Sequence, residues 1–395
     1  MFNNVYIIDA LRTPVGKAPR GVFKQVLPDD LLAHCIRSMC QRYPQVDWNQ
    51  LGDVIIGCAM PEAEQGMNVA RIASLLGGLP DTVPAMTINR FCSSGVQTIA
   101  TAASSIANGE IDMAFAGGVE SMSKVPMGGN KYTANPAIFC EEHVAIAYGM
   151  GITAENVAKQ WGINRQMQDE FAVESHQRAL KAQKAGLFED EIVPFTVHHR
   201  RANEATHEVA ISEVVVTNDE GPRADTSIEA VSRLKPVFAA KGTVTAGNSS
   251  QMSDGAGLAF LASEAMVKKY QLQPIGRFLG FSVAGVPPEI MGIGPIKAIP
   301  KALAQAGLTL EQIDWIELNE AFAAQALAVM KELHLPHEKV NPNGGAIALG
   351  HPLGATGAIR TATLLNGLKH SKGRYGMVTM CIGTGMGAAA IFERL

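Results

Sequence analysis

PAMTINRFCSSG, residues 84–95, begins with a short apolar and β-branched run, which favours a buried strand, and then places Cys92 before two serines and a glycine. Residues 96–109, VQTIATAASSIANG, carry apolar side chains at helical spacing and end on Gly109, a common stop signal. We therefore predict that Cys92 lies at a strand-to-helix turn, where the helix macrodipole and free N–H groups favour the thiolate. The alternative is an inert packing cysteine, because cysteine is among the most buried residue types.

The composition indicates a folded protein with a large core. The 395 residues suffice for two to three domains of about 150 residues, and 47% are hydrophobic against 18% charged. The net charge of −4 gives no indication of nucleic-acid binding. No apolar run reaches the length of a membrane span, and the N-terminus does not read as a signal peptide.

The cysteines show neither a CxxC pattern nor the spacing of metal ligands. We therefore expect free thiols, no metal, and a reducing, cytoplasmic compartment. The six are Cys35, Cys40, Cys58, Cys92, Cys140 and Cys381.

The order of patterns along the chain predicts an α/β fold with an insertion. Strand-like runs at residues 5–9, 53–58 and 112–120 alternate with helical patterns, as in a mostly parallel sheet covered on both faces. Glycine- and proline-rich sequence from residue 121 interrupts this rhythm, and a basic cluster at residues 198–201 predicts a surface patch that could meet a polyphosphate. We divide the chain into an N-terminal half (1–120), an inserted loop or lid domain (121–245) that returns to the N-terminal core near its end, and a C-terminal half (246–395).

The two halves look like a duplication. Residues 298–319 repeat the helix-and-strand order of residues 31–58, and Asp53 precedes Cys92 by about as many residues as Asp314 precedes His351. The alternative is the rhythm common to all α/β proteins. Two similar βαβ halves would pack side by side, with the active site at the strand ends between them.

Four residues of the C-terminal half are candidates for chemistry. His351 lies in the glycine-rich run GGAIALGHPLGATGA (344–358), where glycines allow the close approach of a ligand. Cys381 ends a strand before the glycine turn of CIGTGMG (381–387), whose N–H groups can form an oxyanion hole. Asn319, after the strand WIEL, could hold a water or polarise a carbonyl. Glu320 could be an acid/base group, although a helix-starting glutamate is the commoner explanation.

Together these motifs resemble the thiolase family over nearly the whole chain. A resemblance carried by several separate motifs in the same order is highly specific. The matching segments are NRFCSSG (89–95), AGGVESMS (116–123), GITAENVAKQW (151–161), TVTAGNSSQMSDGA (243–256), NEAFAAQ (319–325), GGAIALGHPLGATGA (344–358) and CIGTGMG (381–387).

The resemblance implies an acyltransferase with duplicated βαβαβ halves in a five-layered α-β-α-β-α core. It implies that Cys92 takes an acyl group from a 3-ketoacyl-CoA and that His351 accepts the thiol proton and contributes to an oxyanion hole. Cys381 is then the acid/base for the acetyl-CoA enolate. Asn319 holds a water that completes the first oxyanion hole, and the backbone N–H groups of Cys92 and Gly383 form the second.

The resemblance also implies how coenzyme A is bound. It places Ser250 at the pantetheine arm and Arg223 at the nucleotide, and it adds Ala246, Phe322 and Met150 to the substrate-binding residues. Coenzyme A is then a substrate, and no permanently bound cofactor is expected. The implied assembly is a homodimer, or a dimer of such dimers.

Two kinds of thiolase remain open at this point. Biosynthetic members, which make acetoacetyl-CoA, have a histidine where this chain has Gly149. We expect its loss to widen the acyl end of the pocket, which favours degradative cleavage of longer 3-ketoacyl-CoA. Less favoured alternatives are a decarboxylating condensing enzyme, which lacks a second catalytic cysteine, and a thiolase-like acyl-CoA carrier without turnover.

Overall fold

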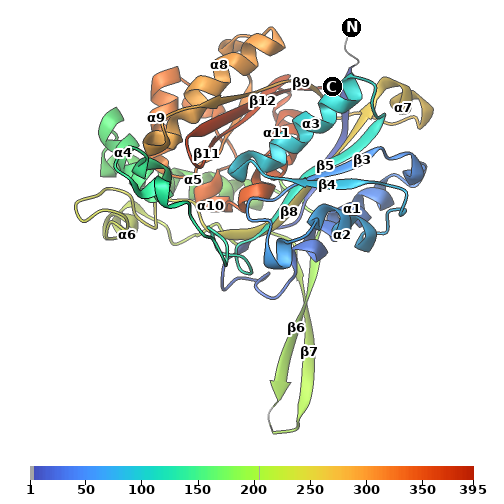
Figure 1. Cartoon of the computed structure of the whole chain (residues 1–395), viewed down its shortest axis with the longest axis horizontal. Helices are drawn as coiled ribbons and strands as arrows, with labels where there is room; N and C mark the ends of the chain where they lie inside the picture. The colour runs from blue at the N-terminus through green and yellow to red at the C-terminus, as the bar shows by residue number, and fades with distance from the viewer. Residues whose placement is uncertain (1–3, 204) are drawn as a thin grey trace.

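A ten-stranded sheet runs through the computed structural model, which describes residues 4–203 and 205–395 (Figure 1). A separate two-stranded sheet is formed by β6 and β7. The strands of both sheets are β1 (Val5–Arg12), β2 (Gly16–Lys17), β3 (Asp53–Gly57), β4 (Ala85–Ile88), β5 (Met113–Ser121), β6 (Phe195–Asn203), β7 (Glu208–Val216), β8 (Ser253–Ser263), β9 (Gly276–Gly285), β10 (Trp315–Leu318), β11 (Tyr375–Ile382) and β12 (Met386–Arg394). The helices are α1 (Pro28–Arg42), α2 (Val69–Leu76), α3 (Ser94–Ala107), α4 (Met150–Trp161), α5 (Arg165–Lys184), α6 (Ile228–Ser232), α7 (Glu264–Lys269), α8 (Gly294–Ala306), α9 (Ala323–Leu333), α10 (Ala346–Leu349) and α11 (Leu353–Ser371).

The pairing of the strands repeats once along the sheet, whose order is β10-β11-β12-β9-β1-β8-β5-β3-β4 with β2 beside β8. In the N-terminal half β3 pairs parallel with β5, β5 antiparallel with β8, and β8 antiparallel with β1. In the C-terminal half β10, β11, β12 and β9 follow the same sequence of parallel, antiparallel and antiparallel pairs. The predicted duplication is therefore confirmed.

Three apolar clusters fill the interfaces between five layers, which are helices, strands, two central helices, strands and helices. One lies between α1, α2 and the outer face of the N-terminal strands, and a second lies between α8, α9 and the outer face of the C-terminal strands. The third surrounds α3 and α11, which lie between the two parts of the sheet (Figure 1). The predicted α-β-α-β-α core is thus confirmed.

The two central helices touch through their glycines. A Cβ on Gly357 of α11 would lie 2.2 Å from the backbone nitrogen of Val96, and one on Gly95 of α3 would lie 2.7 Å from that of Ala358. Only glycine allows this approach of two helix backbones. As a result α11 also contacts the turn Phe91–Ser93, which carries Cys92.

The described helices and strands between β5 and β8 do not join the main sheet. They are α4, α5, α6 and the two-stranded ribbon β6–β7, which projects from the body of the molecule (Figure 1). Buried Arg12 of β1 ties this insertion to the core, because it pairs with Glu191 at 2.6 Å and Asp219 at 2.7 Å. The side chains of residues 199–201, most of the predicted basic cluster, lie outside the described residues.

The strand after the insertion belongs to the first half. β8 pairs with both β5 and β1, so it completes the N-terminal part of the sheet, although the division at residue 246 placed it with the C-terminal half. The sequence pattern could not show this, because a fully buried strand carries no mark of the strands it pairs with.

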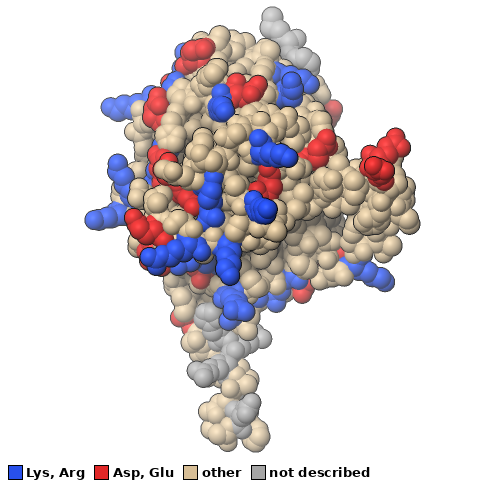
Figure 2. All heavy atoms as spheres, turned by 90° about the vertical axis from the view of Figure 1, so that its left-hand side faces the viewer, with Lys and Arg blue, Asp and Glu red and all other residues tan. Residues whose placement is uncertain are grey.

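Charges are mixed on the face that carries α4 and α6. Figure 2 shows Lys and Arg side chains interspersed with Asp and Glu over this face, without a continuous surface of one sign. Within residues 4–203 and 205–395, no helix combines the length and the apolar character needed to cross a membrane.

Candidate active site

Cys92 lies at a tight turn between β4 and α3, as predicted. Phe91, just before it, adopts a left-handed conformation with φ of 43°. The Asn89 side chain accepts a hydrogen bond from the Phe91 backbone N–H at 2.7 Å, and the Ser94 hydroxyl donates to the Phe91 carbonyl at 2.7 Å. Such local bonds hold a strained backbone that presents a nucleophile at the start of a helix.

His351 and Cys381 open onto the same cavity as Cys92, a space of about 230 Å³. His351 follows Gly350, whose φ of 92° and whose position next to the Ser253 hydroxyl leave no room for a side chain. Cys381 lies near the end of β11, before the turn to β12. The predicted Gly383, Ser250, Phe322 and Met150 line this cavity too. Its remaining walls are Met60, Phe91, Met127, Gly128, Met291, Ala321, Leu353 and Thr384.

Asn319 reaches the cavity through His351. Its Nδ2 lies 3.3 Å from His351 Nε2, and the other ring nitrogen, Nδ1, lies 2.6 Å from the Thr356 hydroxyl. An amide nitrogen can only donate, so Nε2 accepts and Nδ1 carries the proton that Thr356 receives. Buried Asn319 Oδ1 has no hydrogen-bond partner among the described residues, so it is free to hold a water or a substrate group.

Burial makes all three titratable groups neutral. Desolvation raises the pKa of Cys92 to about 12, against a smaller lowering by the N–H groups of Gly383 and Cys92. The pKa of this half-buried thiol is thus shifted in the direction opposite to the predicted one, because desolvation outweighs the N–H groups at the helix terminus. Burial also raises the pKa of Cys381, and burial together with the charge of Arg360 lowers the pKa of His351 to about 3.

Neutral His351 can accept a proton, but the described residues include no hydrogen bond between it and Cys92. Transfer of the thiol proton would create a thiolate and an imidazolium in one cavity, which costs less than either charge alone. Hydrogen bonds of this kind often tighten only when substrate binds.

The buried imidazole predicts a pH dependence of stability. The pKa of His351 is about 3 in the folded chain against 6.5 for an unperturbed histidine, so below pH 6.5 the unfolded chain binds a proton that the folded chain does not. The free energy of unfolding therefore falls as the pH drops, by about 2 kcal/mol between pH 6.5 and about pH 5. Urea unfolding at both pH values measures this fall. We expect the free energy of unfolding of His351→Asn to fall by about 2 kcal/mol less than that of the wild type, because asparagine does not titrate. The same pH dependence in variant and wild type would contradict the assignment.

Glu320 is not an acid/base group of this cavity. Its carboxylate accepts hydrogen bonds from the Ser175 hydroxyl at 2.7 Å, the Asn341 amide at 2.8 Å and the Ile347 N–H at 3.2 Å. It therefore holds the glycine-rich segment before His351, and Gly345 is needed because a Cβ there would overlap this carboxylate.

Glu120 is a buried carboxylate that the sequence analysis did not single out. It accepts hydrogen bonds from the backbone N–H groups of Ala59 and Gly354, both at 2.8 Å, and from the Gln65 amide at 2.8 Å. It thus joins the ends of β3 and β5 to the first turn of α11. The available signal was a charged residue ending the apolar run DMAFAGGVE (112–120). Thr356, the partner of His351, left no such signal.

The predicted Arg223 and Ala246 lie in a second cavity of about 380 Å³. It is also lined by Lys17, by His176, which accepts a hydrogen bond from the Arg223 N–H at 3.1 Å, and by Gln251. Exposed Arg223 pairs with Asp225 at 2.9 Å. Residues 246–251 border both cavities, because Ala246 and Gln251 line this one and Ser250 lines the cavity of Cys92.

Gly149 itself does not line the cavity of Cys92. It is the exposed N-cap residue of α4, and a Cβ there would have no heavy atom within 4 Å. The adjacent Met150 lines the cavity instead. The expected widening of the pocket by the loss of a histidine at position 149 therefore stays a prediction, and the side chains that line the cavity next to this position include Met150.

Two family models together match almost the whole chain. The thiolase N-terminal domain model covers residues 5–265 and the thiolase C-terminal domain model covers residues 272–394. The chain belongs to the thiolase family. The boundary between the two thiolase models falls after β8, in agreement with the pairing of that strand.

The chain is similar to thiolases along its full length. It is 51% identical to 3-ketoacyl-CoA thiolase of Bacillus subtilis (strain 168), with 98% of each chain covered. It is 46% identical to β-ketoadipyl-CoA thiolase of Pseudomonas aeruginosa, with 100% of each chain covered. The crystal structure of the Bacillus anthracis acetyl-CoA acetyltransferase superposes with a TM-score of 0.89 at 41% identity, over 100% of this chain and 99% of that one.

Proposed function

We propose that this thiolase cleaves a 3-ketoacyl-CoA with coenzyme A, giving acetyl-CoA and a shortened acyl-CoA. The observation that carries the proposal is that two thiols and an imidazole, Cys92, Cys381 and His351, open onto one small apolar cavity. Breaking a carbon–carbon bond beside a ketone needs a nucleophile, a stabilised enolate and a proton donor. The similarity to a 3-ketoacyl-CoA thiolase supports the same activity.

In the first half-reaction His351 takes the thiol proton of Cys92, and the sulfur attacks the 3-keto carbon. Hydrogen bonds from the backbone N–H groups of Gly383 and Cys92 act on this sulfur, which supports them as the donors to the oxygen of the tetrahedral adduct. The bond between C2 and C3 then breaks. The departing enolate is stabilised by His351 and a water on Asn319, and Cys381 protonates it to acetyl-CoA.

In the second half-reaction coenzyme A attacks the thioester on Cys92. Its thiol proton restores Cys381, and the released Cys92 thiolate recovers its proton from His351. Two steps that share one acyl-enzyme predict ping-pong kinetics. Every step of this chemistry uses groups of the chain, a water and the two substrates, so we propose coenzyme A as a substrate and no resident cofactor.

The walls of the cavity favour an uncharged, aliphatic acyl chain. None of the described residues that line it is Lys, Arg, Asp or Glu, so a terminal carboxylate, as in a β-ketoadipyl chain, would be buried without a partner. Four of its walls are methionines, which adapt to ligands of different length: Met60, Met127, Met150 and Met291. Formation of acetoacetyl-CoA remains the second candidate, supported by the superposition on an acetyl-CoA acetyltransferase.

A panel of substrates tests this proposal. We expect CoA-dependent cleavage of 3-ketodecanoyl-CoA at least as fast as that of acetoacetyl-CoA, and at least about 100-fold slower cleavage of 3-ketoadipyl-CoA, since an unpaired buried charge costs several kcal/mol. The loss of the 3-ketoacyl enolate absorbance reports each rate. Cleavage of acetoacetyl-CoA alone would favour the biosynthetic function, and efficient cleavage of 3-ketoadipyl-CoA would contradict the apolar pocket.

We propose that the chain works as a homodimer. β4 is the last strand of the sheet and pairs only with β3 among the described residues, and unpaired edges invite pairing with another chain. The buried Oε1 of Gln97 on α3 also lacks a partner within the described part of the chain. Light scattering that gives the 41.9 kDa mass of one chain would reject a dimer.

A cytoplasmic, reducing compartment is part of the proposal. All six cysteines are free thiols, and two of them are the proposed reacting groups. A protein whose activity needs free thiols is suited to a compartment that keeps thiols reduced.

A further inference from the structure

Two walls of the second cavity are short segments of the chain. One is α6 with the residues after it, which contribute Val231 and Leu234; the other is the loop of residues 243–249, which contributes Ala246 and Gly247. α6 has five residues, and a helix this short is unstable alone. The walls meet at Gly247, where a Cβ would lie 2.6 Å from the Leu234 side chain.

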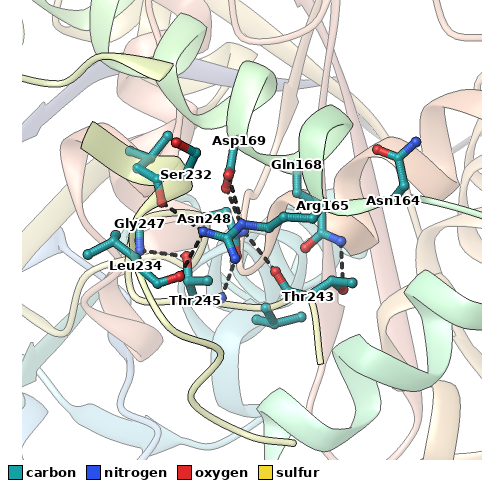
Figure 3. Close-up of polar contacts among 12 residues, drawn as sticks. Asn164, Arg165, Gln168, Asp169, Ser232, Leu234, Thr243, Thr245, Gly247 and Asn248 are labelled. Atoms are coloured by element: carbon teal, nitrogen blue, oxygen red, sulfur yellow. Dashed lines mark hydrogen bonds and ion pairs between the residues drawn. The ribbon is translucent and has the colours of Figure 1, made fainter. Parts of the chain in front are cut away.

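One guanidinium, that of Arg165 at the start of α5, holds the first wall (Figure 3). Its Nη2 donates to the carbonyl oxygens of Val231 at 2.7 Å and Leu234 at 2.9 Å. These carbonyls end α6 and the turn after it, and a cation is the favoured partner of carbonyls at a helix C-terminus.

The same side chain reaches the second wall through Asp169. Arg165 Nε donates to Asp169 Oδ2 at 2.7 Å, and Asp169 Oδ1 accepts the amide of buried Asn248 at 3.0 Å (Figure 3). Asn248 Oδ1 in turn accepts the Thr245 N–H at 2.8 Å, and the Thr245 hydroxyl accepts the Gly247 N–H at 3.1 Å. The conformation of the loop is therefore coupled to Arg165.

We propose that Arg165 is a positioning residue for the nucleotide end of coenzyme A. It does not line the cavity, but its hydrogen bonds hold the first wall directly and reach the second wall through Asp169. The inference rests on the proposed function for the identity of the ligand. Arginine is required because its planar fork donates in several directions at once, whereas lysine is a compact point charge that cannot reproduce the fork.

Arg165→Lys tests the proposal, with pantetheine as an acceptor that lacks the nucleotide. At saturating 3-ketoacyl-CoA, we expect the KM for coenzyme A to rise about tenfold, the scale of one or two charge-assisted hydrogen bonds, and kcat to stay within about threefold. The KM for pantetheine stays unchanged. Calorimetry with desulfo-coenzyme A should show the same tenfold weakening without turnover.

Arg178→Lys is the matched control on the same helix. Arg178 also pairs with a carboxylate one turn away, Glu174 at 2.6 Å, and donates to backbone carbonyls, those of Val340 at 2.6 Å and Asn341 at 3.2 Å, but neither it nor these partners line the second cavity. We expect no change in the ratio of the two KM values. If Arg165→Lys folds poorly, Asp169→Asn removes the ion pair with little change in shape. It should likewise raise the KM for coenzyme A and leave the KM for pantetheine unchanged.

Equal effects on coenzyme A and pantetheine, or an equal effect of Arg178→Lys, would overturn the role of Arg165. A wild-type protein that binds desulfo-coenzyme A but cleaves no 3-ketoacyl-CoA would instead refute the proposed function alone. The affinities of wild type and Arg165→Lys for desulfo-coenzyme A would then still test the role of Arg165. Wild type that does not bind desulfo-coenzyme A would overturn both.

Discussion

Cys92→Ala is expected to lower the rate of thiolysis by about 10⁴-fold or more, because it removes the atom that carries the acyl group. The same variant should take up no acetyl group when incubated with acetyl-CoA, whereas the wild type should gain one. Intact-protein mass spectrometry measures the uptake, and loss of the enolate absorbance measures the rate.

Cys140→Ala is a suitable control, because Cys140 is an exposed thiol that does not line the cavity. We expect this variant to be acetylated as the wild type is. Acetylation that persisted in Cys92→Ala and vanished in Cys140→Ala would move the nucleophile to Cys140. Uptake by neither the wild type nor any variant would support a carrier without turnover.

Cys381→Ala should separate acylation from carbon–carbon cleavage. Removing a general acid typically costs 10²- to 10⁴-fold, and an enolate in a buried apolar cavity has few other proton donors, so we expect a loss of about 10⁴-fold in cleavage. Acetylation of Cys92 by acetyl-CoA needs no proton on carbon, so it should continue. Rapid quenching followed by mass spectrometry measures the acyl-enzyme beside the cleavage rate.

Cys35→Ala controls for the loss of a buried thiol, since Cys35 lies in α1, outside the cavity. It should lower stability but leave cleavage unchanged. Normal cleavage by Cys381→Ala would remove Cys381 from the mechanism. Loss of both acylation and cleavage in Cys381→Ala, at normal stability, would show that Cys381 acts earlier, on Cys92 itself.

The sequence by itself determined the local features of this protein. The apolar run before Cys92 and the helical spacing after it were enough to predict the turn that the structure places between β4 and α3. The repeated order of helices and strands was enough to predict the duplication. Both predictions succeeded because the spacing of apolar residues that is typical of a strand or a helix can be recognised within a short stretch of neighbouring residues.

Only the tertiary structure decided the electrostatics of the site. Desolvation is the largest cause of the raised pKa of Cys92, and the groups that desolvate this half-buried thiol come from segments far away in the sequence, such as those of His351 and Cys381. A helix N-terminus can be recognised from the sequence, but the desolvation that outweighs it cannot.

Contacts between distant segments were equally beyond the sequence. Strand β8 joins the N-terminal half because its edges meet β5 and β1, and Arg165 reaches carbonyls 66 and 69 residues away. Every residue has the same backbone carbonyl group, so no sequence motif predicts which carbonyls an arginine will bind. The family motifs therefore determined which residues gather at the site, and the packing of α3, α11 and the insertion decided how they are held.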